Sequence, residues 1–237
     1  MITCSSRREF LKQVGVTGLT LAASESFVGC AQPSAPPNVV LIFVDDLGYG
    51  DVGVYGARGF DTPHLDRLAH EGMRFTDFYA SQAVCSASRA SLLTGCYAER
   101  VSIRGALGPS AEVGLNVEEE TIADLLKERD YATAMVGKWH LGHHKEFLPL
   151  QHGFDEYLGI PYSNDMWPNH KSWPFPKLPL MRKDNIIATV DNMEAQGRLC
   201  KLFTESSLEF IDEHADVPFF LYLPHAFVHV PRNASAD

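Results

Sequence analysis

Runs of apolar residues along the chain have the pattern of a mostly parallel β-sheet. Continuous apolar stretches at residues 38–44 and 217–223 predict two strands that are buried on both faces. Residues 131–136 predict a third strand, and residues 73–79 alternate in the manner of a fourth. These strands are far apart in the sequence, so we expect the long connections that parallel strands require.

Helical signals fall between the predicted strands. Helices are predicted over four ranges: Pro63–Glu71, Ser86–Leu93, Val117–Arg129 and Gly197–His214. Thr62 is a favourable N-cap for the first helix, and Gly95 lies where a glycine ends the second. The alternation of strands and helices predicts an α/β fold, with helices on both faces of the sheet and the functional site at the carboxyl ends of the strands.

Composition narrows the class of protein. The chain has 237 residues, of which 45% are hydrophobic, enough for one domain or for a large part of a bigger one. A formal net charge of −10 argues against a nucleic-acid partner but allows one focused pocket for an anion. The five cysteines lack CxxC spacing and predict neither a disulfide framework nor a zinc site. No apolar run is long enough to span a bilayer.

Residues 1–30 have the features of an export signal. Arg7-Arg8 lies in a twin-arginine pattern, and the apolar segment 14–23 that follows is too short for a membrane helix. Residues 27–30 resemble a lipobox, so we expect either lipidation of Cys30 or ordinary cleavage nearby. After a proline-rich linker at residues 31–37, residues 38–237 form the predicted domain. We therefore expect the twin-arginine export machinery as a partner and a periplasmic or lipid-anchored location.

Asp45 and Asp46 end the first predicted strand. Adjacent side chains of a strand point to opposite faces, so these carboxylates converge only if the chain turns, which Gly48 and Gly50 would allow. Hard carboxylate oxygens suit Ca²⁺ or Mg²⁺. Residues 48–53 also spell GxGxxG, but a dinucleotide site needs those glycines to open a helix, and the glycines and proline that follow argue against one.

Two further pairs of residues indicate chemistry on an anion. Cys85 precedes the second predicted helix, whose N-terminus favours negative charge, and Arg89 follows one turn later and can reach back over residue 85. Lys138 and His140 are two residues apart after the third strand, so an extended chain points both the same way. A cation beside an imidazole can bind an oxyanion and transfer protons.

Several segments resemble signatures of the formylglycine-dependent sulfatase family of the arylsulfatase A type. They are Asp45-Asp46-Leu47-Gly48-Tyr49-Gly50-Asp51, Cys85-x-Ala87-x-Arg89 with Leu92-Leu93-Thr94-Gly95, Gly137-Lys138-Trp139-His140, Gly159–Asp165 and His229-x-Pro231. The resemblance implies an alkaline phosphatase-like fold and hydrolysis of a sulfate ester. It also implies that a maturation enzyme oxidises Cys85 to formylglycine, which binds Ca²⁺, or else Mg²⁺, together with Asp45 and Asp46.

The resemblance assigns a role to each remaining matched residue. Arg89 and Lys138 would hold the formylglycine oxygens, and His140 would deprotonate the remaining hydroxyl so that sulfate is expelled. Ser163 would contact the substrate, and His229 would assist the leaving alcohol. His225 is a second choice for that last role.

The family pattern also contains an Asp-Asn-Gly metal motif and a lysine beyond the His-x-Pro segment. Asp184-Asn185 and Asp191-Asn192 precede His229 and lack the glycine, so neither is that motif. We therefore expect a catalytic domain that is incomplete at its C-terminal end, and we do not expect full activity from this chain alone. Two alternatives stay open: a phosphate or phosphonate monoester hydrolase of the same superfamily, and a non-catalytic protein that binds sulfoglycans through an unmodified Cys85. The motifs leave open whether the sulfated molecule is small or a glycan.

Overall fold

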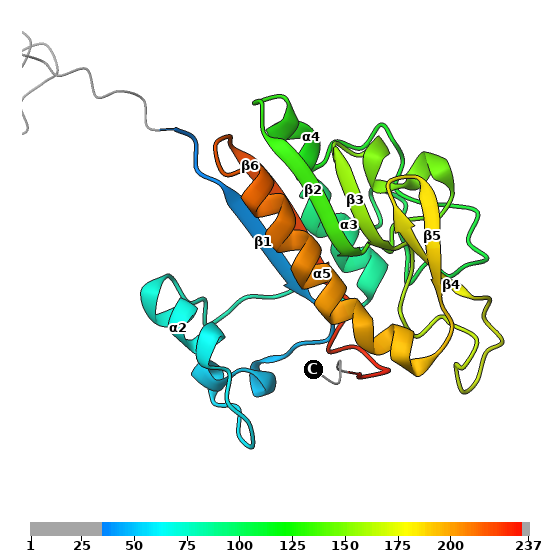
Figure 1. Ribbon diagram of the computed structural model, residues 1–237, viewed down its shortest axis with the longest axis horizontal. Helices are drawn as coiled ribbons and strands as arrows, with labels where there is room; N and C mark the ends of the chain where they lie inside the picture. Colours follow the sequence, from blue (N-terminus) through cyan, green and yellow to red (C-terminus); the bar gives the residue numbers. More distant parts are fainter. Residues whose placement is uncertain (1–34, 234–237) are drawn as a thin grey trace, which may run out of the picture. The chain divides into compact units, whose positions relative to one another are not determined.

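The sheet has six strands in the order β1-β6-β2-β3-β4-β5 (Figure 1). In chain order the strands are β1 (Val39–Val44), β2 (Ala132–Lys138), β3 (Glu156–Ile160), β4 (Leu178–Arg182), β5 (Asn185–Val190) and β6 (Phe219–His225). The first four in spatial order pair in parallel, while β4 and β5 form an antiparallel hairpin at one edge. The sequence predicted an α/β fold with a mostly parallel sheet, and this prediction is confirmed.

This computed structural model describes residues 35–233. The described residues from Pro36 onward group into one unit by their contacts, and the predicted export signal, Cys30 and most of the predicted linker lie outside the described residues. Within the described part, every helix is too short or too polar to cross a bilayer.

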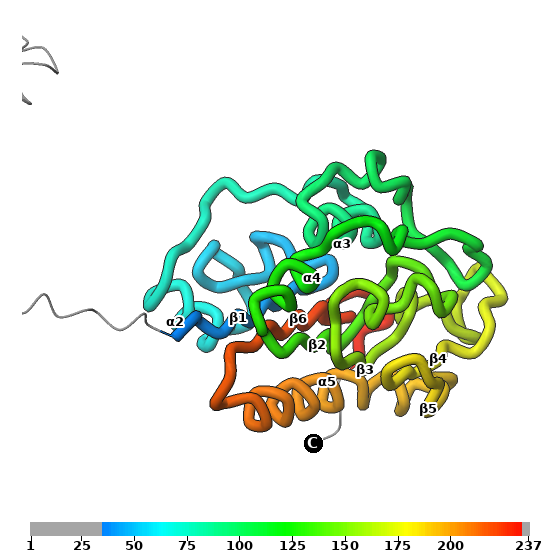
Figure 2. The backbone as a smooth tube through the Cα atoms, turned by 90° about the horizontal axis from the view of Figure 1, so that it is seen from above, coloured from blue at the N-terminus to red at the C-terminus, as the bar shows by residue number. Residues whose placement is uncertain are grey.

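Helices cover both faces of the sheet, as Figure 2 shows edge-on. α3 (Cys85–Thr94) and α4 (Ile122–Lys127) lie on one face, and α5 (Met193–Glu213) lies on the other. Strand β6 divides its side chains between the two layers: Phe220 and Tyr222 join the core under α3, whereas Phe219 and Leu221 join the core under α5. A strand apolar on both faces is thereby buried on both faces, which explains the continuous apolar run at its centre.

Element boundaries differ from the predictions where side-chain caps decide them. The predicted helix over 117–129 shortens to α4, because Thr121 accepts from the Asp124 main-chain N–H and Asp124 bonds back in a capping box. α5 begins earlier than predicted, because Asn192 caps it through the N–H of Ala195 at 2.9 Å. The helix α2 (Pro63–Glu71) and the left-handed Gly95 after α3, at φ 68°, match the predictions.

The strand predicted at residues 73–79 is wrong. The segment has no ladder partner within residues 35–233, and its bulky side chains are exposed, with Phe75 at 60% and Tyr79 at 80%. Alternation alone does not form a strand without a neighbouring strand to accept its hydrogen bonds. β3, β4 and β5 were not predicted. Short 3₁₀ turns complete the fold: η1 (Tyr49–Asp51), η2 (Gly53–Tyr55), η3 (Lys145–Phe147) and η4 (Pro149–Gln151).

Candidate active site

The predicted site residues gather at one edge of the sheet. Asp45 follows β1, Lys138 is the last residue of β2, Ser163 follows β3 and His229 follows β6. Because these four strands are parallel, their carboxyl ends meet at the same edge. Cys85 is the first residue of α3, which packs on that part of the sheet.

The turn after β1 is made by an aspartate rather than by the glycines. Asp46 adopts a left-handed conformation with φ 58°, while Gly48 has an ordinary φ of −107°. Asparagine and aspartate tolerate the left-handed region better than other non-glycine residues. The two carboxylates consequently line the same cleft, as the sequence argument required, although our assignment of the turn to Gly48 and Gly50 was wrong.

A buried ionic cluster lies beneath the cleft. The ammonium group of Lys138 bonds to Asp45 Oδ2 and donates to Ser163 Oγ at 2.9 Å. Arg89 Nη2 lies 3.3 Å from the same Asp45 oxygen, and Arg89 Nη1 donates to the main-chain oxygen of Lys138 at 2.8 Å. Both cationic side chains are fully buried and the Asp45 side chain is 6% exposed. Asp45 therefore links α3, which carries Arg89, and β2, which carries Lys138, to the end of β1.

The cluster carries more positive than negative charge. Two buried cations share one buried carboxylate, and the Nε and Nη2 atoms of Arg89 make no hydrogen bond within the described residues. The Phe43 ring lies 5.4 Å from the guanidinium carbon and stabilises its charge only in part. A buried donor without an acceptor is costly, so the arrangement favours an anionic group at this position.

His140 is positioned as a neutral imidazole. Burial lowers its pKa well below 6.5, and the positive charges of Lys138 and Arg89 lower it further. The side chain is fully buried, and neither ring nitrogen has a hydrogen-bond partner within residues 35–233. Gly137 sets the path into this segment: at φ 136°, a Cβ there would lie 2.2 Å from the Pro224 main-chain oxygen. A neutral imidazole in this position can accept a proton at neutral pH.

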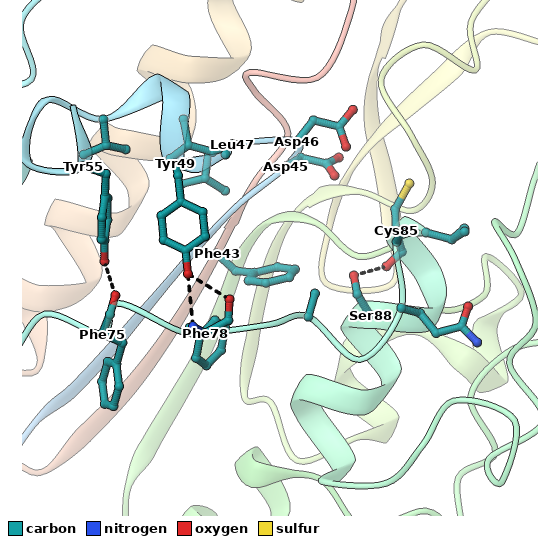
Figure 3. A pocket seen from close by; sticks show the side chains of 17 residues that line it. Phe43, Asp45, Asp46, Leu47, Tyr49, Tyr55, Phe75, Phe78, Cys85 and Ser88 are labelled. Carbon is teal, nitrogen blue, oxygen red and sulfur yellow. Dashed lines mark hydrogen bonds between the residues drawn. The ribbon is translucent and has the colours of Figure 1, made fainter. Parts of the chain in front are cut away.

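Cys85 lines a cleft of about 660 Å³ together with Asp45 and Asp46. Figure 3 shows its sulfur facing the side on which both carboxylates lie. The Ser88 hydroxyl donates to the main-chain oxygen of Cys85 at 3.2 Å and supports the first turn of α3. The structure thus brings together the residue predicted to carry the nucleophile and the two predicted metal ligands.

The two candidate histidines, His225 at the end of β6 and His229 beyond it, contact different parts of the structure. His229 Nε2 is 3.6 Å from Asp46 Oδ2, and its side chain is 14% exposed, so it lies at the edge of the site. His225 Nε2 is 3.5 Å from Cys200 Sγ, on the face covered by α5. His229 rather than His225 is therefore the histidine that contacts a residue lining the cleft, Asp46.

The two carboxylates are of the type that binds a hard divalent cation, but they provide few ligands. Asp45 and Asp46 supply carboxylate oxygens, the ligands that Ca²⁺ and Mg²⁺ prefer. A group of three or more His, Cys, Asp or Glu side chains around one point does not occur in residues 35–233. The two Asp-Asn pairs that we set aside have structural roles: Asp184 lies 3.6 Å from Lys145, and Asn192 caps α5.

Sequence reasoning missed two residues that support the site. Tyr222 of β6 lies beside Arg89, and burial raises the pKa of its hydroxyl to about 12, so it stays neutral. Gln196 of α5 donates to the main-chain oxygen of Asn164 at 2.6 Å, next to Ser163, and is fully buried. The two-residue period of a strand could have placed Tyr222 on the same face as Phe220, but the tertiary structure is needed to bring Gln196 to the loop after β3.

Fold and site together define the class of protein. The sheet is mostly parallel and has helices on both faces. Cations, carboxylates and the cysteine at the start of α3 lie at the carboxyl ends of its strands. This is the architecture of an alkaline phosphatase-like α/β enzyme. The sequence profile of the Sulfatase family matches residues 37–237. The chain belongs to the sulfatase family.

Individual relatives agree with this assignment. Arylsulfatase G of Mus musculus is 40% identical over 225 residues, covering 84% of this chain and 42% of that protein. N-acetylgalactosamine-6-sulfatase of Canis lupus familiaris is 37% identical over 233 residues, covering 92% and 44%. The crystal structure of PsFucS1 sulfatase from Pseudoalteromonas sp. superimposes with a TM-score of 0.74 at 31% identity, covering 84% and 46%. The chain thus spans less than half of the length of each of these relatives.

Proposed function

We propose that this chain supplies the nucleophile-bearing part of an enzyme that hydrolyses a sulfate ester. The observation that carries the proposal is the surplus of buried positive charge beside Cys85. Arg89 and Lys138 share a single carboxylate, and Arg89 keeps two nitrogen atoms without hydrogen bonds in the described residues. A sulfate ester bears one negative charge over three terminal oxygens, and these oxygens can accept from such donors.

We further propose that Cys85 is converted to formylglycine and that Asp45 and Asp46 hold Ca²⁺, or alternatively Mg²⁺. A hydrated formylglycine supplies a hydroxyl nucleophile where a thiol cannot, and a divalent cation supplies positive charge at the sulfate oxygens. The chain's own side chains then divide the remaining work. Arg89 and Lys138 neutralise charge on the anion, and Ser163 keeps the Lys138 ammonium in place.

Two histidines provide the proton transfers in this proposal. His140, held neutral by burial and by its cationic neighbours, accepts a proton within the buried part of the site. His229 lies at the rim beside Asp46, where it can donate to the oxygen of the departing alcohol. Overall, water adds across the S–O bond, so that the products are an alcohol, sulfate and one proton.

The substrate is a sulfated small molecule or a sulfated glycan. One of the relatives is N-acetylgalactosamine-6-sulfatase, whose name refers to a sulfated amino sugar, and this supports the glycan as the first class to test. A panel of sulfated monosaccharides, sulfated oligosaccharides and aryl sulfates, each compared by kcat/KM, separates the two classes. Hydrolysis of aryl sulfates without hydrolysis of any sulfated sugar would contradict a glycan substrate.

We also propose that the protein is exported by the twin-arginine route. It then lies in the periplasm or is anchored to the cell envelope by a lipid at Cys30. Arg7-Arg8 and the apolar segment that follows support it. Fusing residues 1–37 to a reporter that is active only after folded export tests the route, with Arg7→Lys/Arg8→Lys as the control. Export that is unchanged in this double variant would contradict the twin-arginine route.

The central test combines mass spectrometry with turnover. The chain is coexpressed with a formylglycine-generating maturation enzyme, and the peptide that contains residue 85 is weighed; conversion of the thiol to an aldehyde is expected. Aryl sulfate and aryl phosphate hydrolysis are then compared, in the wild type and in Cys85→Ala, with Cys96→Ala as the matched cysteine control. Cys96 is also free and partly buried.

Each outcome of this test decides between the alternatives. With the remainder of the catalytic domain present, we expect sulfate turnover that disappears in Cys85→Ala and persists in Cys96→Ala. Phosphate turnover equal to or faster than sulfate turnover would make the protein a phosphate or phosphonate ester hydrolase. An intact thiol at residue 85 together with tight binding of sulfated glycans would make it a binding protein.

A further inference from the structure

The loop between β3 and β4, residues 161–177, starts and ends at the catalytic edge of the sheet. Because β4 runs antiparallel to β3, the chain leaves the sheet at the carboxyl end of β3 and returns to it at the same end. Ser163, which contacts Lys138, lies near the start of this loop. In Figure 1 the loop is coloured yellow-green and lies beyond the end of β3. Side chains of the loop can therefore contact a substrate that extends past the catalytic edge.

The two tryptophans of this loop have opposite environments. Trp167 is 3% exposed and packs in the core under α5. Trp173 is 64% exposed, although tryptophan is largely buried in most proteins. Trp139, the third tryptophan of the chain, is fully buried. The protein thus has one exposed indole, and it lies on the loop that begins beside Ser163.

Main-chain hydrogen bonds hold Trp173 in place. The N–H groups of Ser172 and Trp173 both donate to Nδ1 of His170, at 3.1 and 3.0 Å. The Phe175 N–H donates to the Trp173 main-chain oxygen at 3.0 Å, and the Phe175 ring packs edge-on against His170 with centroids 5.2 Å apart. Pro174 fixes φ directly after Trp173. A ligand that stacks on this indole consequently orders little additional chain, which lowers the entropy cost of binding.

An unpaired cation lies two positions before Trp173. Lys171 is exposed and has no ion-pair partner among residues 35–233, whereas Lys177 at the end of the loop lies 3.1 Å from Asp191. The chain has a net charge of −10, so a polyanion is repelled overall and binds best where positive charge is unpaired. A flat apolar ring beside an unpaired ammonium group suits a ligand that has both apolar faces and negative charge.

We propose that Trp173 and Lys171 form a subsite for a sulfated glycan, in which one sugar ring stacks on the indole and a sulfate group that is not hydrolysed pairs with the ammonium. This inference rests on the proposed function and narrows its substrate to the glycan. The C–H face of a sugar ring is apolar and its edge is polar, which matches the face and the N–H edge of an indole. A sugar chain whose reacting sulfate lies at the catalytic edge extends over the loop, whereas a small aryl sulfate has no second group for the subsite.

Fluorescence quenching by acrylamide tests the subsite without any need for turnover. Trp139 and Trp167 are buried, so the fluorescence that acrylamide quenches comes from Trp173. The chain is titrated with hexasaccharides of chondroitin 6-sulfate, ι-carrageenan and fucoidan, and with the desulfated form of each. We expect at least one sulfated hexasaccharide to lower the Stern–Volmer constant by about twofold, because a stacked sugar covers one face of the indole. Its desulfated form should bind about tenfold more weakly, since the charge-assisted contact with Lys171 is lost.

Variants of the loop separate stacking from charge. Trp173→Ala should weaken binding of that hexasaccharide by about tenfold in isothermal titration calorimetry, while Trp173→Phe keeps an aromatic face and restores part of the affinity. Lys171→Gln should weaken binding and reduce its dependence on salt. Lys177→Gln is the matched control, because that lysine is already paired with Asp191, and it should change both quantities little. Equal affinity of the wild type and Trp173→Ala would overturn the proposal.

The outcomes distinguish failure of the subsite from failure of the proposed function. If none of the three sulfated glycans protects Trp173 while aryl sulfates are hydrolysed, the subsite is overturned and the sulfatase proposal stands. Protection of Trp173 by a sulfated glycan while residue 85 remains a thiol would support the subsite and contradict the sulfatase proposal. Protection that rises with protein concentration in the absence of glycan would overturn the subsite in favour of a second copy of this chain.

Discussion

Replacing Asp45 by asparagine tests whether the buried ionic cluster holds the catalytic edge together. The substitution keeps the size of the side chain and removes its charge. Arg89 and Lys138, both fully buried, then lose the carboxylate that they share. Breaking a buried ion pair by removing one partner costs about 3–5 kcal/mol, because the remaining charge is left uncompensated. Against a total stability of about 5–15 kcal/mol, the expected loss is a large fraction.

Urea denaturation followed by circular dichroism measures this loss. The experiment is done with a chelator present, so that divalent cations do not contribute to the free energy of unfolding. Asp46→Asn is the matched control, since Asp46 is the adjacent carboxylate, its side chain is 67% exposed and its only ion-pair distance within the described residues is 3.6 Å to His229. Exposed pairs contribute about 0–1 kcal/mol, so a small change is expected there.

A double variant locates the cause of the destabilisation. Lys138→Met removes one of the two cations, so Asp45→Asn/Lys138→Met should lose less than the sum of the two single variants by about 1–3 kcal/mol. Equal losses in Asp45→Asn and Asp46→Asn, or strict additivity in the double variant, would refute the reasoning. Either result would mean that the cluster is solvated in solution.

Three further predictions concern residues around the site. Burial lowers the pKa of His152 from 6.5 to about 4. Between these two pH values the unfolded chain binds a proton at this residue that the folded chain does not. The free energy of unfolding therefore falls by up to about 3 kcal/mol as pH drops from 6.5 to 4. His152→Phe should flatten the dependence of the urea midpoint on pH over that window, and an unchanged slope would count against it. At Gly137, φ is 136° and a Cβ would lie 2.2 Å from a main-chain oxygen of β6, so Gly137→Ala should lower the free energy of unfolding by more than about 3 kcal/mol, measured by thermal unfolding. Gly50→Ala is the control: its Cβ meets nothing within 4 Å, and the expected loss is less than about 0.5 kcal/mol. Gln196→Leu removes the donor to the buried Asn164 main-chain oxygen and should cost about 1–3 kcal/mol; no change in the urea midpoint would show that water replaces the bond.

Local signals predicted the elements around the motifs well. β1 ends where the apolar run meets Asp45, and α3 begins at Cys85 and ends before Gly95, because strand burial and a left-handed glycine are local properties. The prediction failed at residues 73–79, where alternation suits a strand but the described chain offers no ladder. It also failed at β3, β4 and β5, since short strands at one edge of a sheet depend on neighbours that the sequence does not reveal.

The sequence by itself determined the alternation of strands and helices, the position of Cys85 at a helix start and the residue types that can bind an anion or a hard cation. These properties depend on spacing within a few residues, which the chain carries locally. Only the tertiary structure decided which charges meet: Asp45 pairs with residues 44 and 93 positions away, and His229 rather than His225 lies beside Asp46. Such pairings follow from the parallel order of β1, β6, β2 and β3, which brings distant strand ends to one edge and turns alternate side chains to opposite faces.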